Sequence, residues 1–315
     1  MTKVLFRYDC APWLEDRLAG LASEGVEVAT CGEADDDAYP RLMAEAEVLW
    51  HVLRPVTAEA IAAAPRLRLI QKIGVGVNTI DLDAAKSRGI AVCNMPGTNT
   101  AAVAELALGA MLACLRRIVA FDGAVRAGRG WAWPLDWQGG LGEIGGRTVG
   151  LVGFGAVPRR LAPVLEALGA EVIFWNRTPR PEAGFAQVDK AELLARADIV
   201  SMHLPLTPET ADWLDAEAIA ALRPGAVVVN VARGGLVDEA ALVAALESGH
   251  VAAAGLDVFA REPVAPDDPL LARDEVVLTP HVGWLTRETL ERSLAVALDN
   301  VRRLETGRDL RHGVA

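Results

Sequence analysis

The stretch TVGLVGFGAVPRR, residues 148–160, joins an apolar run to a glycine-rich turn and then to a helix-forming segment. Gly153 and Gly155 match the first two glycines of the pattern G-x-G-x-x-G. The first permits a tight turn, and the second lets a pyrophosphate approach the backbone. Pro158 replaces the third glycine. Because a strand precedes the turn and another ends about 20 residues later at Asn176, the stretch predicts the start of a dinucleotide-binding domain.

Proline at position 158 is compatible with this interpretation. The N–H groups in the first turn of a helix have no intrahelical partner, so a proline there breaks no bond. We expect the amides of Ala156 and Val157 to face the phosphates, where the helix dipole favours negative charge. Pro163 removes the N–H that would reach Arg159, so we expect the helix to be distorted or to start late.

Apolar runs alternate with alanine- and leucine-rich segments on both sides of this stretch, and the alternation restarts near residue 147. Such alternation predicts an α/β fold with two doubly wound parallel sheets. The expected strands are KVLFRY (3–8), GVEVAT (25–30), AEVLWHV (46–52), LRLIQKI (67–73), IAVCN (90–94), TVGLVGFG (148–155), EVIFWN (171–176), ADIVSMHL (197–204), AVVVNVA (226–232), AAAGLDVF (252–259) and EVVLTP (275–280). Expected helices include WLEDRLAGLA (13–22), AEAIAAA (58–64), DLDAAKSRG (81–89) and one near 100–120.

Composition excludes several classes of protein. The chain has 315 residues, 52% of them hydrophobic, which suits two domains with large cores. A net charge of −11 argues against nucleic acid as a partner. The longest apolar run, 106–115, is too short to span a membrane and predicts a buried helix.

The cysteines and the start of the chain favour a cytoplasmic protein. The start, MTKVLFRYDC, has a short apolar run followed by charges, so we expect no secretory signal. The widely spaced cysteines form no metal-type pairs, and we expect reduced thiols and no metal. These cysteines are Cys10, Cys31, Cys93 and Cys114.

The stretch EVIFWNRTPR, residues 171–180, lacks the acidic residue that ordinarily ends the second strand. That acid binds the 2′-hydroxyl of NAD, whereas a nearby arginine can accommodate the 2′-phosphate of NADP. Asn176 replaces the acid, Arg177 adds a cation, Thr178 adds a donor, and Arg180 lies close in sequence. We therefore expect NADP(H) to be preferred over NAD(H). Alternatively, Arg177 points to solvent or stacks on adenine, and both cofactors are accepted.

Three later segments place polar residues directly after apolar strands. Arg233 follows one strand, Asp257 and Glu262 follow the next, and His281 follows the last. Ligands bind at the carboxyl ends of strands in open α/β sheets, so we expect these side chains to lie together. Taken singly, they could instead be an exposed arginine, loop carboxylates and a capping histidine.

These residue types suit hydride transfer between a nicotinamide and a C–OH carbon, in which a proton also moves. A histidine such as His281 can exchange that proton, and Glu262 can orient the imidazole. Arg233 can form two hydrogen bonds to a carboxylate and so place the neighbouring carbonyl. A serine hydrolase is disfavoured, because no serine lies in a G-x-S-x-G elbow.

The chain resembles the D-isomer-specific 2-hydroxyacid dehydrogenase family, and within it the NADP-preferring glyoxylate and hydroxypyruvate reductases. The matching segments, which cover nearly the whole chain, are IGVGVNTIDLDAAKSRGIAVCNMPG (73–97), NTAAVAE (99–105), VGLVGFGAVPRR (149–160), HLPLTPET (203–210), VNVARGGLVDE (229–239), GLDVFAREP (255–263) and TPHVGW (279–284). The resemblance implies an NAD(P)-dependent oxidoreductase that reduces a small 2-keto acid, glyoxylate or hydroxypyruvate, to the D-2-hydroxy acid.

The resemblance also implies roles for single residues. Arg233, Glu262 and His281 would be catalytic, and the backbone at Val75 and Gly76 would bind the substrate carboxylate. Together with the glycine stretch, it implies a cofactor site made of Gly153, Gly155, Ala156, Val157, Asn176, Arg177 and Thr178, of Pro205 and Thr210 near the adenosine, and of Thr100, Val231 and Asp257 near the nicotinamide. Candidate walls of the substrate site are Leu53, Trp131, Trp133, Trp137 and Trp284.

The family fold implies a Rossmann-type cofactor domain, residues 98–285, and a flavodoxin-like substrate domain, residues 1–97 and 286–315. The active site would lie in the cleft between them. Family members are usually homodimers joined through the cofactor domains. A tryptophan of the connecting segment 127–146 would then approach the neighbour's site. Otherwise this segment is a packed connecting loop.

Departures from the family pattern leave alternatives open. Pro158 bears on the pyrophosphate geometry, and Asn78 stands where the family often has Asp. A D-3-phosphoglycerate-type dehydrogenase remains an alternative, although His51 stands where that branch would carry a phosphate-binding arginine. Formate and phosphite dehydrogenases are less favoured, since their extra signatures are not evident. A non-catalytic NAD(H)-sensing regulatory protein of the same fold is the alternative from another class.

Overall fold

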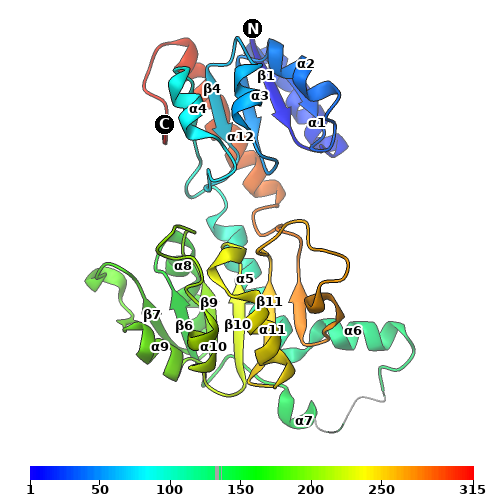
Figure 1. Ribbon diagram of the computed structural model, residues 1–315, viewed down its shortest axis with the longest axis vertical. Helices are drawn as coiled ribbons and strands as arrows, with labels where there is room; N and C mark the ends of the chain where they lie inside the picture. The colour runs from blue at the N-terminus through cyan, green and yellow to red at the C-terminus, as the bar shows by residue number, and fades with distance from the viewer. Residues whose placement is uncertain (132–134, 136) are drawn as a thin grey trace. The chain divides into compact units, whose positions relative to one another are not determined.

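The computed structural model describes residues 1–131, 135 and 137–315, with only the backbone described at Trp137 and Gln138. Trp133, a candidate wall of the substrate site, lies outside the described residues. The chain forms two compact units, drawn in Figure 1. Unit 1 comprises Met1–Thr98 and Thr286–Ala315, and unit 2 comprises Asn99–Leu285.

Unit 1 is built on a five-stranded parallel sheet with the order β2-β1-β3-β4-β5. The strands are β1 (Thr2–Arg7), β2 (Val26–Cys31), β3 (Val48–His51), β4 (Leu69–Lys72) and β5 (Ala91–Cys93). The helices are α1 (Pro12–Ala19), α2 (Ala38–Glu45), α3 (Ala58–Ala62), α4 (Leu82–Ser87) and α12 (Arg287–Glu305). Every residue of β3 and β4 is buried, as expected of central strands covered by helices on both faces.

Unit 2 is built on a seven-stranded parallel sheet with the order β12-β11-β10-β9-β6-β7-β8. The strands are β6 (Thr148–Val152), β7 (Glu171–Trp175), β8 (Ala186–Gln187), β9 (Ile199–Met202), β10 (Ala226–Asn230), β11 (Val251–Leu256) and β12 (Val276–Leu278). The helices are α5 (Thr100–Arg116), α6 (Ile118–Arg126), α7 (Trp137–Gly140), α8 (Ala156–Ala167), α9 (Lys190–Arg196), α10 (Ala216–Ala220) and α11 (Glu239–Glu247).

Helices bury apolar residues on both faces of the unit 2 sheet. Side chains of α5 and α8 form one hydrophobic core with the sheet, and side chains of α9, α10 and α11 form a second core. Strand β6 pairs with β7 on one side and with β9 on the other, so the order of strands reverses at this point. In doubly wound folds a ligand binds outside the carboxyl ends of the strands at such a reversal. The glycine turn follows β6 there.

The predicted fold class, with two doubly wound parallel sheets, is confirmed. The helix after the glycines was expected to be distorted or to start late. A late start is wrong, because α8 begins at Ala156 and contains Pro163. Strand β8 has no counterpart among the expected strands, because it is two residues long and both are exposed, which leaves no apolar run. No helix among the described residues combines the length and apolarity that a membrane span needs.

Candidate functional site

The glycine turn after β6 leaves an uncovered helix end. Gly153 has a φ of +94°, and a Cβ there would lie 3.0 Å from the carbonyl oxygen of His203, so only glycine fits without strain. Gly155 is the N-cap of α8, and no side chain caps this end of the helix. A Cβ at Gly155 would meet nothing within 4 Å. Open space beside uncapped N–H groups fits the pyrophosphate of a dinucleotide.

The turn after β7 is held by two amide side chains. Asn176 Oδ1 accepts the N–H of Phe154 at 3.2 Å, which ties the turn to the glycine stretch. Asn176 Nδ2 donates to the carbonyl oxygen of Thr178 at 2.8 Å. Gln187 Nε2 donates to the carbonyl oxygen of Asn176 at 3.0 Å, and Gln187 Oε1 accepts the N–H of Arg180 at 2.8 Å. Asn176 therefore shapes the turn, whereas the exposed Arg177 supplies its cation.

Arginines beside this turn are paired with an acid. Arg159 of α8 donates to Glu182 at 2.9 Å, and Arg180 Nη1 lies 3.8 Å from the same carboxylate. The side chains of all three are about half exposed, so these pairs contribute little to stability. One carboxylate offsets only one of these two positive charges, so the group keeps one net positive charge beside the turn.

Thr210 organises the segment HLPLTPET. Its hydroxyl donates to the carbonyl oxygen of Pro205 at 2.7 Å and accepts the N–H of Thr207 at 2.8 Å. Both residues predicted near the adenosine therefore belong to one hydrogen-bonded loop after β9. Thr100 is the first residue of α5, and Val231 directly follows β10 and is buried.

Arg233 follows β10 on a loop that glycine makes possible. Asn230 Nδ2 donates to the carbonyl oxygen of Arg233 at 2.9 Å, which fixes the turn. A Cβ at Gly234 would overlap the backbone of Phe259, at 1.8 Å from its carbonyl carbon, so this loop packs tightly on the one after β11. Burial lowers the pKa of the Arg233 guanidinium, and the charge of Glu262 opposes this. Arg233 nevertheless stays charged at neutral pH.

His281 and Glu262 form a hydrogen-bonded pair. His281 Nδ1 lies 2.7 Å from Glu262 Oε2, and Glu262 Oε1 accepts the N–H of Phe259 at 3.0 Å. Burial raises the pKa of Glu262, but the hydrogen bonds from His281 and Phe259 and the charges of His281 and Arg233 outweigh it, so the pKa is lowered. A proton on Nδ1 that is donated to this carboxylate leaves Nε2 of the ring for exchange with a substrate.

Asp257 holds the loop that carries His281. Its side chain is 3% exposed. Oδ1 accepts the hydroxyl of Thr279 at 2.6 Å and the N–H of Val282 at 2.9 Å, and Oδ2 accepts the N–H of Gly283 at 2.8 Å. The His281 N–H donates to the carbonyl oxygen of Asp257 at 2.8 Å. These bonds support a φ of +55° at His281, which non-glycine residues rarely adopt.

An apolar cavity of about 200 Å³ adjoins these residues within unit 2. Val231 and Asp257, both predicted near the nicotinamide, line it together with residues of α5, β11 and β12. Among the described residues, no group of three His, Cys, Asp or Glu side chains is arranged to hold a metal.

In unit 1, the residues predicted to meet the substrate lie on loops after neighbouring strands. Leu53 follows β3 and is 38% exposed, and Val75 follows β4 and is 44% exposed. Asn94 Nδ2 donates to the carbonyl oxygen of Val75 at 2.9 Å. The N–H of Val56 donates to the carbonyl oxygen of Thr79 at 2.8 Å, so the two loops are connected.

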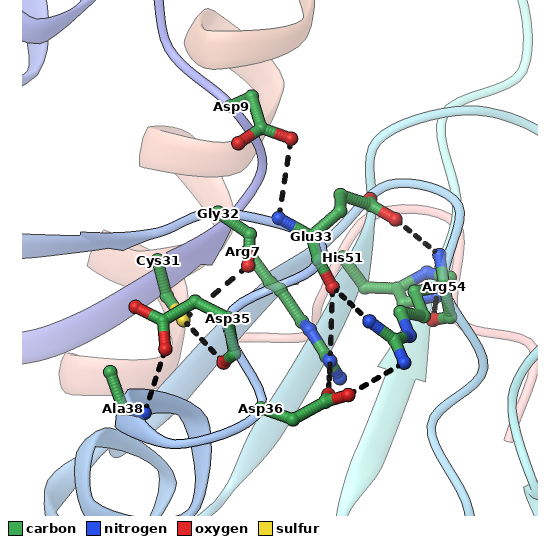
Figure 2. A network of polar contacts seen from close by, with 10 residues as sticks. All are labelled: Arg7, Asp9, Cys31, Gly32, Glu33, Asp35, Asp36, Ala38, His51 and Arg54. Carbon is green, nitrogen blue, oxygen red and sulfur yellow. Dashed lines mark hydrogen bonds and ion pairs between the residues drawn. The ribbon is translucent and has the colours of Figure 1, made fainter.

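Figure 2 shows a polar network at this edge of the unit 1 sheet. Arg7 and His51 occupy paired positions at the ends of β1 and β3 and are both buried. His51 Nε2 lies 2.7 Å from the carbonyl oxygen of Arg54. Burial, together with the charge of Lys72, lowers the pKa of His51 to about 3, so the ring is uncharged at neutral pH.

Sequence reasoning missed the residues that fix these loops. No sequence motif points to Glu33, to Gln187 or to the structural role of Asp257. Each of these side chains forms hydrogen bonds with backbone groups of another loop. Trp284 is 9% exposed and Trp131 is 95% exposed, so only the second lies at the surface of its unit. The side chain of Trp137 is outside the described part.

Known proteins show the same organisation. Residues 108–283 match the family described as D-isomer specific 2-hydroxyacid dehydrogenase, NAD binding domain. D-3-phosphoglycerate dehydrogenase of Mycobacterium leprae is 45% identical over 251 residues, which are 78% of this chain and 47% of that protein. Glyoxylate reductase of Aeropyrum pernix is 38% identical over 265 residues, which are 82% of this chain and 79% of that protein.

A solved structure extends this likeness to the whole chain. The crystal structure of TT0316 protein from Thermus thermophilus has a TM-score of 0.90, 37% identity and full coverage of both chains. The chain spans about half the length of the mycobacterial relative. The similarity thus covers the whole chain. Unit 2 carries both the glycine turn and the three residues Arg233, Glu262 and His281. The chain belongs to the D-isomer-specific 2-hydroxyacid dehydrogenase family, whose fold binds a nicotinamide cofactor.

Proposed function

We propose that this protein reduces a small 2-keto acid to the D-2-hydroxy acid with a nicotinamide cofactor. The hydrogen bond of 2.7 Å between His281 and Glu262 carries the proposal. It supports an imidazole oriented for proton transfer, in the same unit as the glycine turn and Arg233. Unit 2 would be the cofactor domain and unit 1 the substrate domain.

Reduction adds a hydride to the carbonyl carbon and a proton to the carbonyl oxygen. The cofactor, when bound, supplies the hydride. Nε2 of His281 donates the proton, while Glu262 keeps Nδ1 in place and stabilises the charged ring. Arg233 binds the substrate carboxylate through two N–H groups, and the backbone amides at Val75 and Gly76 would complete its binding.

Glyoxylate or hydroxypyruvate is the proposed substrate. The basic side chains near Leu53 are already engaged. His51 is uncharged, Lys72 Nζ donates to the carbonyl oxygen of Val52, and Arg54 Nη2 donates to Asp36 at 2.8 Å. A phosphate at this edge would compete with these partners. Glyoxylate and hydroxypyruvate carry no charged group besides their carboxylate, so they need no such cation.

A D-3-phosphoglycerate dehydrogenase activity is the second candidate, and the mycobacterial relative favours it. A panel of glyoxylate, hydroxypyruvate and 3-phosphohydroxypyruvate, each at matched concentration, separates the two. We expect kcat/KM to be highest for an unphosphorylated acid. A higher kcat/KM for the phosphorylated acid would reverse the assignment, and no turnover of any acid would favour a regulatory protein.

We further propose that NADP(H) is preferred, because Arg177 stands exposed in a turn without a carboxylate at position 176. The test is kcat/KM for NADPH and NADH with saturating glyoxylate, in wild type and Arg177→Ala. We expect NADPH to be favoured by at least about tenfold, or ~1.4 kcal/mol, and the variant to lose this preference. Equal use of both cofactors by the wild type would contradict it.

A homodimer in the cytoplasm is the proposed state. Helix α6 has no buried residue, and Ile118, Val119 and Val125 on it are each more than half exposed. Apolar side chains on one surface helix are typical of a protein interface. We expect Ile118→Glu to convert a dimer to a monomer in sedimentation experiments. A wild-type monomer would contradict the proposal.

A further inference from the structure

One carboxylate joins two loops of unit 1. Glu33 lies on the loop after β2, and Figure 2 shows its carboxylate bonded to Arg54 on the loop after β3. Oε1 accepts the N–H of Leu53 at 3.0 Å, and Oε2 accepts the N–H of Arg54 at 2.9 Å. Two consecutive amides in an irregular loop therefore share one charged acceptor, which fixes the direction of both peptide groups.

The backbone of the same residue is fixed in turn. The carbonyl oxygen of Glu33 accepts Arg54 Nη1 at 2.7 Å and Arg7 Nη2 at 3.3 Å. Asp36 bridges the same arginines, with Oδ1 at 3.1 Å from Arg7 and Oδ2 at 2.8 Å from Arg54. Each of the two loops therefore contributes a side chain that bonds the backbone of the other loop.

This arrangement is anchored in the buried part of the unit. Arg7 is 4% exposed, and its guanidinium lies 3.5 Å from the centre of the Tyr39 ring. Asp9, after β1, accepts the N–H of Glu33 at 3.3 Å. Because the buried Arg7 restricts Glu33 on one side, the carboxylate can restrict the Leu53 loop on the other.

We propose that Glu33 is a positioning residue that holds Leu53 and Arg54 in the conformation that meets the substrate. This inference rests on the proposed function, because it takes unit 1 as the substrate domain. Glu33 acts through the loop and not by touching the keto acid. Loss of its carboxylate therefore weakens substrate binding and leaves the cofactor site of unit 2 unchanged.

The first test is amide hydrogen exchange of the peptide that contains Leu53 and Arg54, in wild type, Glu33→Gln and Glu33→Ala. We expect exchange of these amides to accelerate in both variants. Asp35→Ala is the matched control, since Asp35 lies on the same loop but its carboxylate accepts the N–H of Ala38, the first residue of α2. Unchanged exchange in the Glu33 variants would overturn the proposal, whatever the substrate is.

The second test separates substrate binding from turnover. We expect Glu33→Ala to raise KM for the keto acid about tenfold, with kcat changed less than about threefold and the Kd of NADPH unchanged. Glu33→Gln, which keeps one acceptor oxygen, should give a smaller rise. A rise in the Kd of NADPH as large as that in KM would show a general loss of structure and overturn the proposal.

A double-mutant cycle tests whether Glu33 acts through the loop. We expect the effect of Glu33→Ala on KM to shrink at least about threefold in a Leu53→Ala background, because contacting residues are not additive. Full additivity would overturn the proposal. If the wild type reduces no keto acid, the proposed function fails, and hydrogen exchange still decides whether Glu33 holds the loop.

Discussion

The loop that carries His281 in unit 2 and the loop that carries Leu53 in unit 1 are held in the same way. Asp257 accepts the N–H groups of Val282 and Gly283, and Glu33 accepts those of Leu53 and Arg54. In each case one carboxylate orients two consecutive peptide groups. A single carboxylate can therefore hold a loop that follows a strand in one conformation, although the loop pairs with no other strand.

The two carboxylates differ in burial and in what their loops present. Asp257 is 3% exposed and supports a side chain suited to proton transfer. Glu33 is only partly buried, and its loop presents an apolar side chain. A hydrogen bond is costlier to lose where water cannot replace it. The comparison predicts large effects at the His281 loop and smaller ones at the Leu53 loop.

The largest effect is expected at His281 itself. His281→Ala should lower kcat by about 10²- to 10⁴-fold, because the proton donor is lost. The Kd of NADPH, measured by fluorescence titration, should stay the same, since the glycine turn is untouched. A kcat close to the wild-type value would show that His281 is not the proton donor and that its loop does not present a catalytic side chain.

The next effect sharpens the contrast between the two carboxylates. Asp257→Asn should lower the free energy of unfolding by about 3 kcal/mol, because an amide cannot accept both N–H groups in a buried site. Glu33→Gln should lower it by only about 1 kcal/mol, since water can reach its loop. Urea denaturation measures both. Equal losses would mean that burial does not distinguish the loops.

The glycine turn offers a matched pair of smaller changes. Gly153→Ala should destabilise the fold by about 1 kcal/mol or more, because alanine disfavours a φ of +94°. Gly155→Ala should leave the melting temperature unchanged, since a Cβ there meets nothing within 4 Å. Only the second change should specifically weaken NADPH binding, by roughly tenfold, because its side chain occupies the space left for the pyrophosphate. Unchanged NADPH binding in Gly155→Ala would place the cofactor elsewhere.

The smallest expected effect is a change in how stability falls at acidic pH. The folded-state pKa of Glu262 is lowered, so its contribution to stability is fully present above the ordinary glutamate pKa and is lost as pH falls through the folded pKa. We expect Glu262→Gln to flatten the fall in stability on acidification below about pH 4. Melting temperatures across that range measure it. If the melting temperature of the variant falls with pH as steeply as that of the wild type, the pair of Glu262 and His281 adds no stability.

Much of unit 2 could be predicted from the sequence, because its signals are local. Gly153 and Gly155 reveal a turn through their spacing. Arg233, Glu262 and His281 follow apolar strands, and parallel strands bring their carboxyl ends to one edge whatever the details of packing. Pro158 in the first helical turn also follows from a local rule, since that N–H lacks a partner.

Only the tertiary structure reveals which side chain holds which loop. Glu33 and Leu53 are far apart in sequence, and so are Asp257 and Gly283. Their contacts depend on strand order and on the exact shape of irregular loops. Asn176 Oδ1 accepts the N–H of Phe154, which follows the neighbouring strand, and no local pattern predicted that bond. The sequence by itself determined the alternation of strands and helices and the residue types at the strand ends, because both depend on local pattern. The tertiary structure decided the partner of each carboxylate, because a side chain bonds whichever unpaired backbone group the fold brings within reach.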